Sequence, residues 1–238
     1  MDIEDCNNCK NWPKFPKQLS GVTSGLLGNT VMICGGCNDG FGHYTCQNDN
    51  SITDECYSFT SQKTTLVTHM AVERTNAASI VLNDNTLWIT GGLGKYGRLA
   101  STEHVKMSGS MPGPDLPTAL ESHAMAAINS TVSMVIGGWD GSGMDGTEST
   151  YYHYHIKGEW SNGPSLIQTR HRHAVGIVTD EETNEEFVAV TGGNFFDDSS
   201  QTGIYDSQVF IGSSEVLQDG KWIKGIVKNT IKLYFGNF

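Results

Sequence analysis

Short apolar runs separated by polar turns recur along the whole chain. Four of these runs end in a glycine pair, and the pairs begin at Gly35, Gly91, Gly137 and Gly192, at intervals of 56, 46 and 55 residues. Each run is long enough for a β-strand and too short for a helix. Nowhere do helix-forming residues keep a 3.6-residue spacing for more than about two turns. The pattern therefore predicts an all-β fold built from repeats.

Each predicted repeat contains four strands in the same order. One strand precedes the run that ends in Gly-Gly, and a polar loop and two further strands follow it. The first strands are expected in GVTSGLLGN, RTNAASIVLND, ESHAMAAINS and RHRHAVGIVTD. The fourth strand often carries Trp or Pro, as in EWSNGPSL and KWIKG. Trp160 and Trp222 are expected to pack between neighbouring sheets, because a large ring fits there.

This order, spacing and residue usage resemble the kelch repeat, whose period is about 50 residues. The segment GGWDG, at positions 137–141, is especially similar to the family pattern. The resemblance implies a kelch-type β-propeller with four recognisable four-stranded blades, in an incomplete or small ring. A four-stranded blade cannot bury both of its faces alone, whereas blades stacked around an axis bury them against one another.

The repeats divide the chain into three parts. We assign residues 1–20 to an N-terminal arm that contains cysteines and residues 225–238 to a tail or an extra strand. The repeats between them are expected at 21–72, 73–117, 118–166 and 167–224. The segment NWPKFP, at positions 11–16, resembles an outer strand that could complete the last blade and close the ring; the alternative is that the chain forms part of a larger ring.

Charge and hydropathy narrow the range of partners. The formal net charge is −11, and no basic stripe exists to neutralise nucleic-acid phosphates, so nucleic acid is excluded as a partner. No apolar run approaches the length of a membrane span. The N-terminus is acidic and polar and does not resemble a signal peptide.

One side of the predicted disc is the candidate binding surface. In a four-stranded antiparallel meander, the second-to-third loop and the loop to the next blade emerge on the same side, and loops on a rigid scaffold carry function. Exposed aromatic residues and arginines are the usual anchors of protein interfaces. The candidates for binding a protein partner are Phe41, Tyr44, Arg74, Tyr96, Trp139, Arg170, Arg172 and Phe195. The alternative for each residue is that it packs one loop against another.

All six cysteines lie near the N-terminal end, at positions 6, 9, 34, 37, 46 and 56. Cys34 lies in a second strand and Cys56 opens the adjacent third strand, where a disulfide can form if the register allows. The spacing of Cys6, Cys9, Cys34 and Cys37 also fits a two-knuckle zinc site, and free thiols are a third possibility. We favour disulfides, because close cysteine spacings near loops are typical of secreted modules.

Disulfides favour an extracellular location, with the cytoplasm as the alternative. Asn129, in Asn-Ser-Thr, is the only glycosylation sequon of the chain and lies in a predicted turn. It can be modified only in a protein that enters the secretory pathway.

Two histidine pairs, His153 with His155 and His171 with His173, suggest a metal site. Histidines among tyrosines in a propeller resemble copper oxidases of the galactose-oxidase type. However, His173 and His123 occupy the same position of their repeats, and no cysteine beyond position 56 could cross-link to a tyrosine. No other catalytic motif is present. We therefore expect no metal, no cofactor and no enzymatic activity.

The predicted function is that of a non-catalytic scaffold for protein–protein interaction. Two alternatives follow from the kelch resemblance: a substrate-recognition fragment of a cullin ubiquitin-ligase adaptor with a BTB domain, or an actin-binding kelch protein. Fold alone does not identify the partner.

Overall fold

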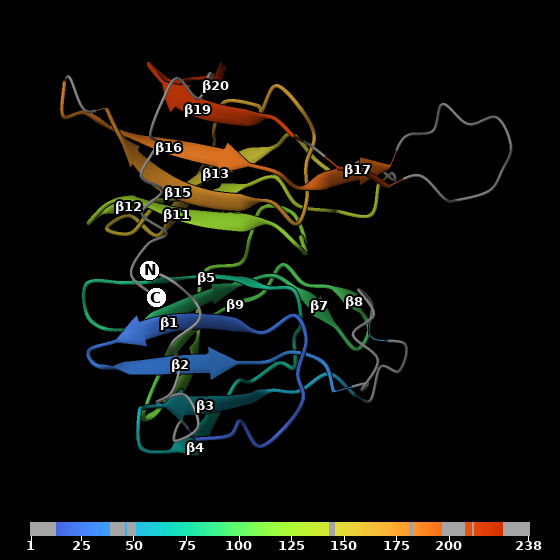
Figure 1. Ribbon diagram of the computed structural model, residues 1–238, viewed down its shortest axis with the longest axis vertical. Coiled ribbons are helices and arrows are strands. Elements are labelled where there is room, and N and C mark those ends of the chain that lie inside the picture. Colours follow the sequence, from blue (N-terminus) through green and yellow to red (C-terminus); the bar gives the residue numbers. More distant parts are fainter. Residues whose placement is uncertain are drawn as a thin grey trace, which may run out of the picture.

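The computed structural model describes residues 13–38, 46, 51–142, 146–180, 183–196, 208–210 and 212–225. Its strands form four antiparallel four-stranded sheets and two short hairpins (Figure 1). This arrangement is all-β and propeller-like, as the repeat pattern predicts. In the part of the chain described, no helix is both long and apolar enough to cross a membrane.

The four sheets follow one another along the chain. Sheet 1 contains β1 (Thr23–Leu27), β2 (Thr30–Cys34), β3 (Glu55–Phe59) and β4 (Thr64–His69). Sheet 2 contains β5 (Ala78–Val81), β6 (Leu87–Thr90), β9 (Thr102–Lys106) and β10 (Gly109–Pro112). Sheet 3 contains β11 (Ala124–Asn129), β12 (Val132–Ile136), β13 (Thr150–Tyr154) and β14 (Glu159–Asn162). Sheet 4 contains β15 (Ala174–Thr179), β16 (Glu186–Thr191), β19 (Ser214–Gln218) and β20 (Lys221–Gly225).

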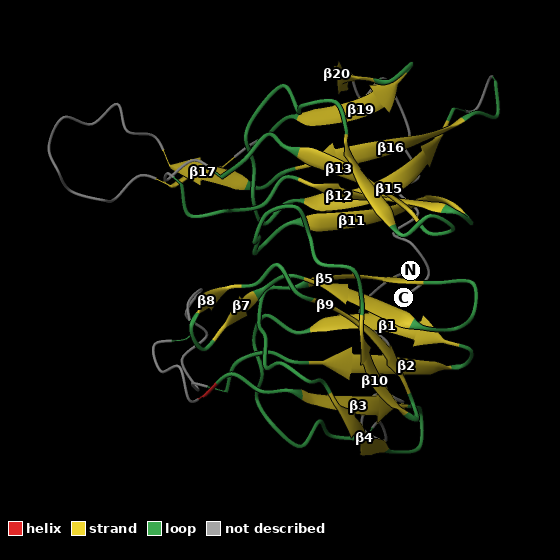
Figure 2. Ribbon diagram, turned by 180° about the vertical axis from the view of Figure 1, so that it is seen from behind, coloured by secondary structure: helices red, strands yellow, loops and turns green. Residues whose placement is uncertain are grey.

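The two hairpins extend the connections between second and third strands. In sheet 2 the connection carries β7 (Leu93–Gly94) and β8 (Gly97–Arg98), and in sheet 4 it carries β17 (Asn194–Phe196) and β18 (Gln208–Phe210). Both hairpins lie on the same side of the sheets, on the right in Figure 1 and on the left in the rear view of Figure 2. We call this side the loop face; it is formed by the described residues of the connections 35–54, 91–101, 137–149 and 192–213 and by the links 70–77, 113–123 and 163–173.

The first strands of the four sheets lie innermost. Packing joins β1 to β5, β5 to β11 and β11 to β15, whereas no comparable packing joins β15 back to β1 among the described strands. Figure 1 accordingly shows sheets 1 and 4 at opposite ends of the long axis. The four strands border a hollow of about 700 Å³ that is lined mostly by small and aliphatic side chains.

Three apolar clusters bury the facing surfaces of neighbouring sheets. Met32 and Cys34 of sheet 1 pack with Leu87 and Ile89 of sheet 2. Trp160 of sheet 3 packs against the cluster between sheets 2 and 3. In the third cluster, Trp222 of sheet 4 packs with residues of sheet 3, and its indole N–H donates to the Pro164 carbonyl at 3.0 Å. The expected packing of both tryptophans between sheets is confirmed.

The described part of the N-terminal arm, residues 13–20, lies against sheet 1. The ring of Phe15 lies 5.0 Å from that of Tyr57, and Lys17 forms an ion pair with Glu55. Sheet 4 takes its four strands from residues 174–225. The tail from residue 226 lies outside the described residues.

The glycine pairs bring neighbouring sheets into backbone contact. Gly91 has φ +57°, and a Cβ there would lie 2.4 Å from the Leu120 carbonyl oxygen and 2.8 Å from the His123 ring. Gly35 and Gly137 meet the carbonyls of Arg74 and Arg170 in the same way. At these three glycines no side chain larger than hydrogen fits, because the neighbouring carbonyl occupies the space that a Cβ would need.

Gly192 tests this interpretation. It has the equivalent position and a similar φ of +69°, but a Cβ there would meet no atom of the described residues within 4 Å. Both Gly91→Ala and Gly192→Ala place alanine in a left-handed conformation, which costs about 1–2 kcal/mol. Gly91→Ala also overpacks the contact between sheets, which costs about 1–3 kcal/mol more. We expect Gly91→Ala to lower the free energy of unfolding by that additional amount, measured by urea denaturation; equal losses would contradict the prediction.

Candidate functional site

A stack of three side chains connects sheets 2, 3 and 4 on the loop face. The guanidinium carbon of Arg98 lies 3.9 Å from the centre of the Trp139 ring, and the ring of His171 lies 6.2 Å from Trp139 on a nearly parallel plane. Arg98 Nε also forms an ion pair with Glu121 at 3.0 Å. The stack therefore combines a cation–π contact with an ion pair, both of which hold the loops in place.

The backbone fixes the position of this stack. Glu121 pairs with Trp139, and His171 pairs with Asn194, in isolated antiparallel bridges. Equivalent bridges join Ser20 to Cys37 and Thr75 to Leu93 in the preceding repeats. The residue after each glycine pair is thus always bonded to the link that enters the same sheet, so its side chain is placed by the repeat itself.

Tyr96 lies apart from the stack, at the tip of the β7–β8 hairpin. Its side chain is 94% exposed, the highest value among the exposed large hydrophobic residues of the described chain. The ammonium group of Lys95 lies 5.5 Å from the centre of its ring. The exposure expected of Tyr96 is therefore confirmed, and its contact with a partner stays a prediction.

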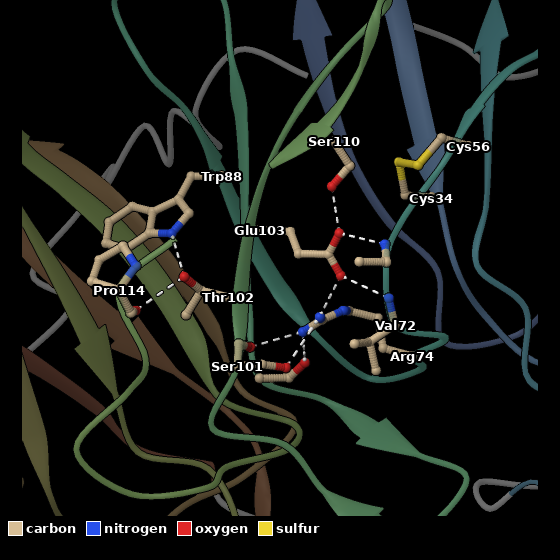
Figure 3. A network of polar contacts seen from close by, with 12 residues as sticks. Cys34, Cys56, Val72, Arg74, Trp88, Ser101, Thr102, Glu103, Ser110 and Pro114 are labelled. Atoms are coloured by element: carbon tan, nitrogen blue, oxygen red, sulfur yellow. Dashed lines mark hydrogen bonds and ion pairs between the residues drawn. A yellow bond between two sulfur atoms is a disulfide. The ribbon is translucent and has the colours of Figure 1, made fainter. Parts of the chain in front are cut away.

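Two of the predicted anchors are not available. Arg74 is 1% exposed and Arg170 is 0% exposed, so the expectation that they contact a partner is wrong. The Nη2 atom of Arg74 donates to Glu103 at 2.8 Å, and its Nη1 donates to the carbonyls of Gly91 and Ser101 (Figure 3). A guanidinium group can be buried only where such acceptors are present, and here they serve both Nη1 and Nη2.

Arg170 repeats the arrangement in sheet 4. Its Nη2 donates to Glu215 at 2.6 Å and its Nη1 donates to the Gly192 carbonyl at 2.8 Å. Backbone N–H groups complete both carboxylates: those of Ala71 and Val72 donate to Glu103, and those of Ile167 and Gln168 donate to Glu215. The arginines therefore join the link between sheets to the third strand of the following sheet.

The other predicted anchors divide into two groups. Trp139 and Arg172 are partly exposed on the loop face, and Arg172 has φ +55°. Phe41 and Tyr44 lie outside the described residues, as does the side chain of Phe195, whose backbone belongs to β17. Sequence reasoning missed Arg98 and Glu121, which hold Trp139. Their signal in the sequence was weak, because Arg98 lies in a hairpin outside the repeat pattern and Glu121 takes a repeat position at which the other links have Ser20, Thr75 and His171.

Four of the six cysteines form two disulfides. Cys34 pairs with Cys56 across neighbouring strands, with Cα atoms 4.1 Å apart, and Cys37 pairs with Cys46 within the sheet 1 connection, with Cα atoms 6.0 Å apart. Cys34 and Cys37, which are separated by two residues, are thus each bonded to another cysteine and not to each other. Cys6 and Cys9 lie outside the described residues. In the chain-entropy account, a bridge that closes about 20 residues contributes about 3 kcal/mol.

Among the described residues, four histidines are buried: His123, His153, His171 and His173. Burial lowers the pKa of His123 to about 3, and burial together with the neighbouring Arg170 lowers the pKa of His173 to about 3. His123 bonds to the Thr90 hydroxyl at 2.8 Å, whereas Ile136 replaces that threonine beside His173. Within the described ranges, no group of three or more His, Cys, Asp or Glu side chains is arranged to hold a metal ion.

His153 lies between Trp88 and Trp160, with ring centres 4.8 and 4.7 Å away. Burial, together with the nearby His155 and His104, lowers the pKa of His153 to about 4. The rings of His153 and His155 lie close together, with centres 5.1 Å apart, because alternate side chains of an extended chain project to the same side. Their surroundings are aromatic, and His155 also bonds to the Ser133 hydroxyl at 2.8 Å.

Comparisons with known proteins bear on the fold. No family model matches the chain, and no curated protein matches it. The solved structure of YjhT is similar, with a TM-score of 0.72 and 13% sequence identity, over 90% of this chain and 72% of that chain. At this identity the similarity concerns the fold alone, and it agrees with a propeller-like arrangement of sheets.

The buried Arg74–Glu103 pair makes a specific prediction. Sheet 3 has Leu120 and Tyr151 at the equivalent positions, in an apolar contact. Arg74→Leu alone leaves Glu103 buried without its cation, which we expect to cost about 3–5 kcal/mol. Adding Glu103→Tyr should restore most of this loss by copying the sheet 3 pair. Urea denaturation of the single and double variants measures both values, and a double variant as unstable as the single one would contradict the interpretation.

The buried histidines predict a pH dependence of stability. His123, His153 and His173 have pKa values of about 3 to 4 in the folded protein, below the unfolded value near 6.5. The unfolded chain therefore binds more protons below pH 6.5, so stability falls as the pH decreases toward 4. Each histidine contributes about 1.4 kcal/mol per pH unit. Chemical denaturation between pH 4 and 8 should show this slope, and it should be shallower in His153→Phe; an unchanged slope would contradict the assignment of His153.

Proposed function

We propose that this chain is a kelch-type propeller scaffold that binds a protein partner through the loop face and catalyses no reaction. The observation that carries the proposal is the presentation of Tyr96, 94% exposed at the tip of the β7–β8 hairpin. Tyrosine supplies a large amphipathic contact area at a low cost in conformational entropy, which makes it a frequent anchor of protein interfaces.

The base of this hairpin is held firmly. Arg98 ends β8, and its side chain contacts Trp139 and Glu121. The backbone of Leu93 pairs with that of Thr75. A partner that contacts Tyr96 would therefore meet a surface ordered before binding, which reduces the entropy lost on association. Trp139 lies partly exposed beside this base and would extend the contact.

The length of the loop-face connections supports the same proposal. The connections of sheets 1 and 4 contain the most residues, and the Cys37–Cys46 bridge joins two positions within the first of them. The turns on the opposite side, such as the one between β1 and β2, are short. Long loops on one side of a rigid scaffold are where binding residues are usually found.

We also propose that the protein acts outside the cell. The support is the pair of disulfides, Cys34–Cys56 and Cys37–Cys46, since such bridges persist in oxidising compartments.

The binding proposal predicts different effects at the two ends of the sheets. A photoreactive amino acid replaces Tyr96 in one sample and Ile156 in another; Ile156 is 85% exposed in the turn between β13 and β14. A protein cross-linked from position 96 but not from position 156 is identified by mass spectrometry and purified. Tyr96→Ala should weaken its binding about 10- to 30-fold, as expected for an interface anchor, while Ile156→Ala leaves it unchanged. Equal capture from both positions, or full affinity of Tyr96→Ala, would overturn the proposal.

A further inference from the structure

The end of the sheets opposite the loop face carries the Asn129-Ser130-Thr131 sequon. Asn129 ends β11, and Ser130 and Thr131 form the tight turn that leads into β12. Both Asn129 and Ser130 are exposed. The sequon thus occupies a two-residue hairpin turn, where an enzyme can reach the asparagine without unfolding a strand.

The geometry of this turn is specific. The backbone N–H of Thr131 donates to Asn129 Oδ1 at 2.8 Å, and the Thr131 hydroxyl donates to the same oxygen at 2.9 Å. Neither bond involves Nδ2, the atom that is glycosylated. Two donors on the carboxamide oxygen keep the side chain in one orientation.

From this geometry we infer that Asn129 carries an N-linked glycan. In the reaction, Asn129 Nδ2 forms a bond to the anomeric carbon of the first sugar of an oligosaccharide that is linked to a lipid pyrophosphate. The bond between that carbon and the pyrophosphate breaks, and the lipid pyrophosphate leaves with the bonding electrons. The Nδ2 proton passes to a base of the transferring enzyme.

The surroundings of Asn129 can accept a sugar. A hollow of about 200 Å³ lies beside the turn, and it is lined in part by Asn83, Asp84, Ser130 and His155. These side chains offer amide, carboxylate and hydroxyl groups to sugar hydroxyls. The two disulfides independently favour the compartment in which glycosylation takes place.

The position of the glycan has a consequence for binding. Asn129 lies at the hairpin end of sheet 3, whereas Trp139 follows the other end of β12 and lies on the loop face. A glycan at Asn129 therefore projects away from the loop face and leaves that face accessible. This inference rests on the proposed extracellular location and not on the proposed binding function.

The natively produced protein provides the first test. Peptide mapping by mass spectrometry should find Asn129 in a glycopeptide, and peptide N-glycosidase should remove the glycan and convert Asn129 to aspartate. An unmodified Asn129 in the bulk of the native protein would overturn the inference.

Matched variants provide the second test, with the full chain produced in a eukaryotic secretory host. Thr131→Ala removes the hydroxyl donor, and Thr131→Ser keeps it. Thr131→Ala and Asn129→Gln should lose the gel shift that glycosidase causes in the unaltered chain, while Thr131→Ser retains it. Formation of the Cys34–Cys56 bridge checks that each variant is folded. A shift that persists in folded Asn129→Gln would place the glycan elsewhere and overturn the assignment.

Discussion

The close approach of one sheet to the next at the glycine pairs is the constraint on which the rest of the structure depends. The N–H groups of Gly36, Gly92 and Gly138 each donate to a carbonyl of the following link, at 2.8 to 2.9 Å. A second series runs around the inner strands, from Asn76 N to Gly21 O, from Ser122 N to Asn76 O and from Arg172 N to Ser122 O, each at 2.8 Å. These bonds fix the distance between sheets, and apolar side chains then fill the space that remains.

Two kinds of side-chain pair stabilise the links at equivalent positions. Sheets 2 and 4 use a buried arginine with a glutamate, and sheet 3 uses Leu120 with Tyr151. Sheet 1 has Leu19 and Tyr57 at these positions. The two members change together, because a buried cation without its anion would be far more costly than either complete pair. The fold therefore requires that these two positions be filled and that any buried charge be paired. Both the arginine–glutamate pair and the leucine–tyrosine pair meet this requirement.

Much of the fold could be predicted from the repeat. The glycine pairs and the four-strand order recur four times, and each recurrence constrains the others; the packing of Trp160 and Trp222 follows from their place in the fourth strands of two repeats. The site was less accessible to prediction. Arg74 and Arg170 precede first strands in links that were expected to be exposed, and their burial depends on Glu103 and Glu215, which are 29 and 45 residues away in the sequence. Only the folded arrangement brings these charges together.

The same physical argument separates scaffold from binding surface. Residues that belong to the repeat, such as His123 and Arg170, are buried because they lie where one sheet contacts the next. Tyr96 and Arg98 have no equivalents in the repeat pattern, and they lie in a hairpin added to one connection. A side chain that the repeat does not need for packing is free to be selected for contact with a partner. We therefore expect the residues that select a partner to be those outside the repeat, and not those that recur in it.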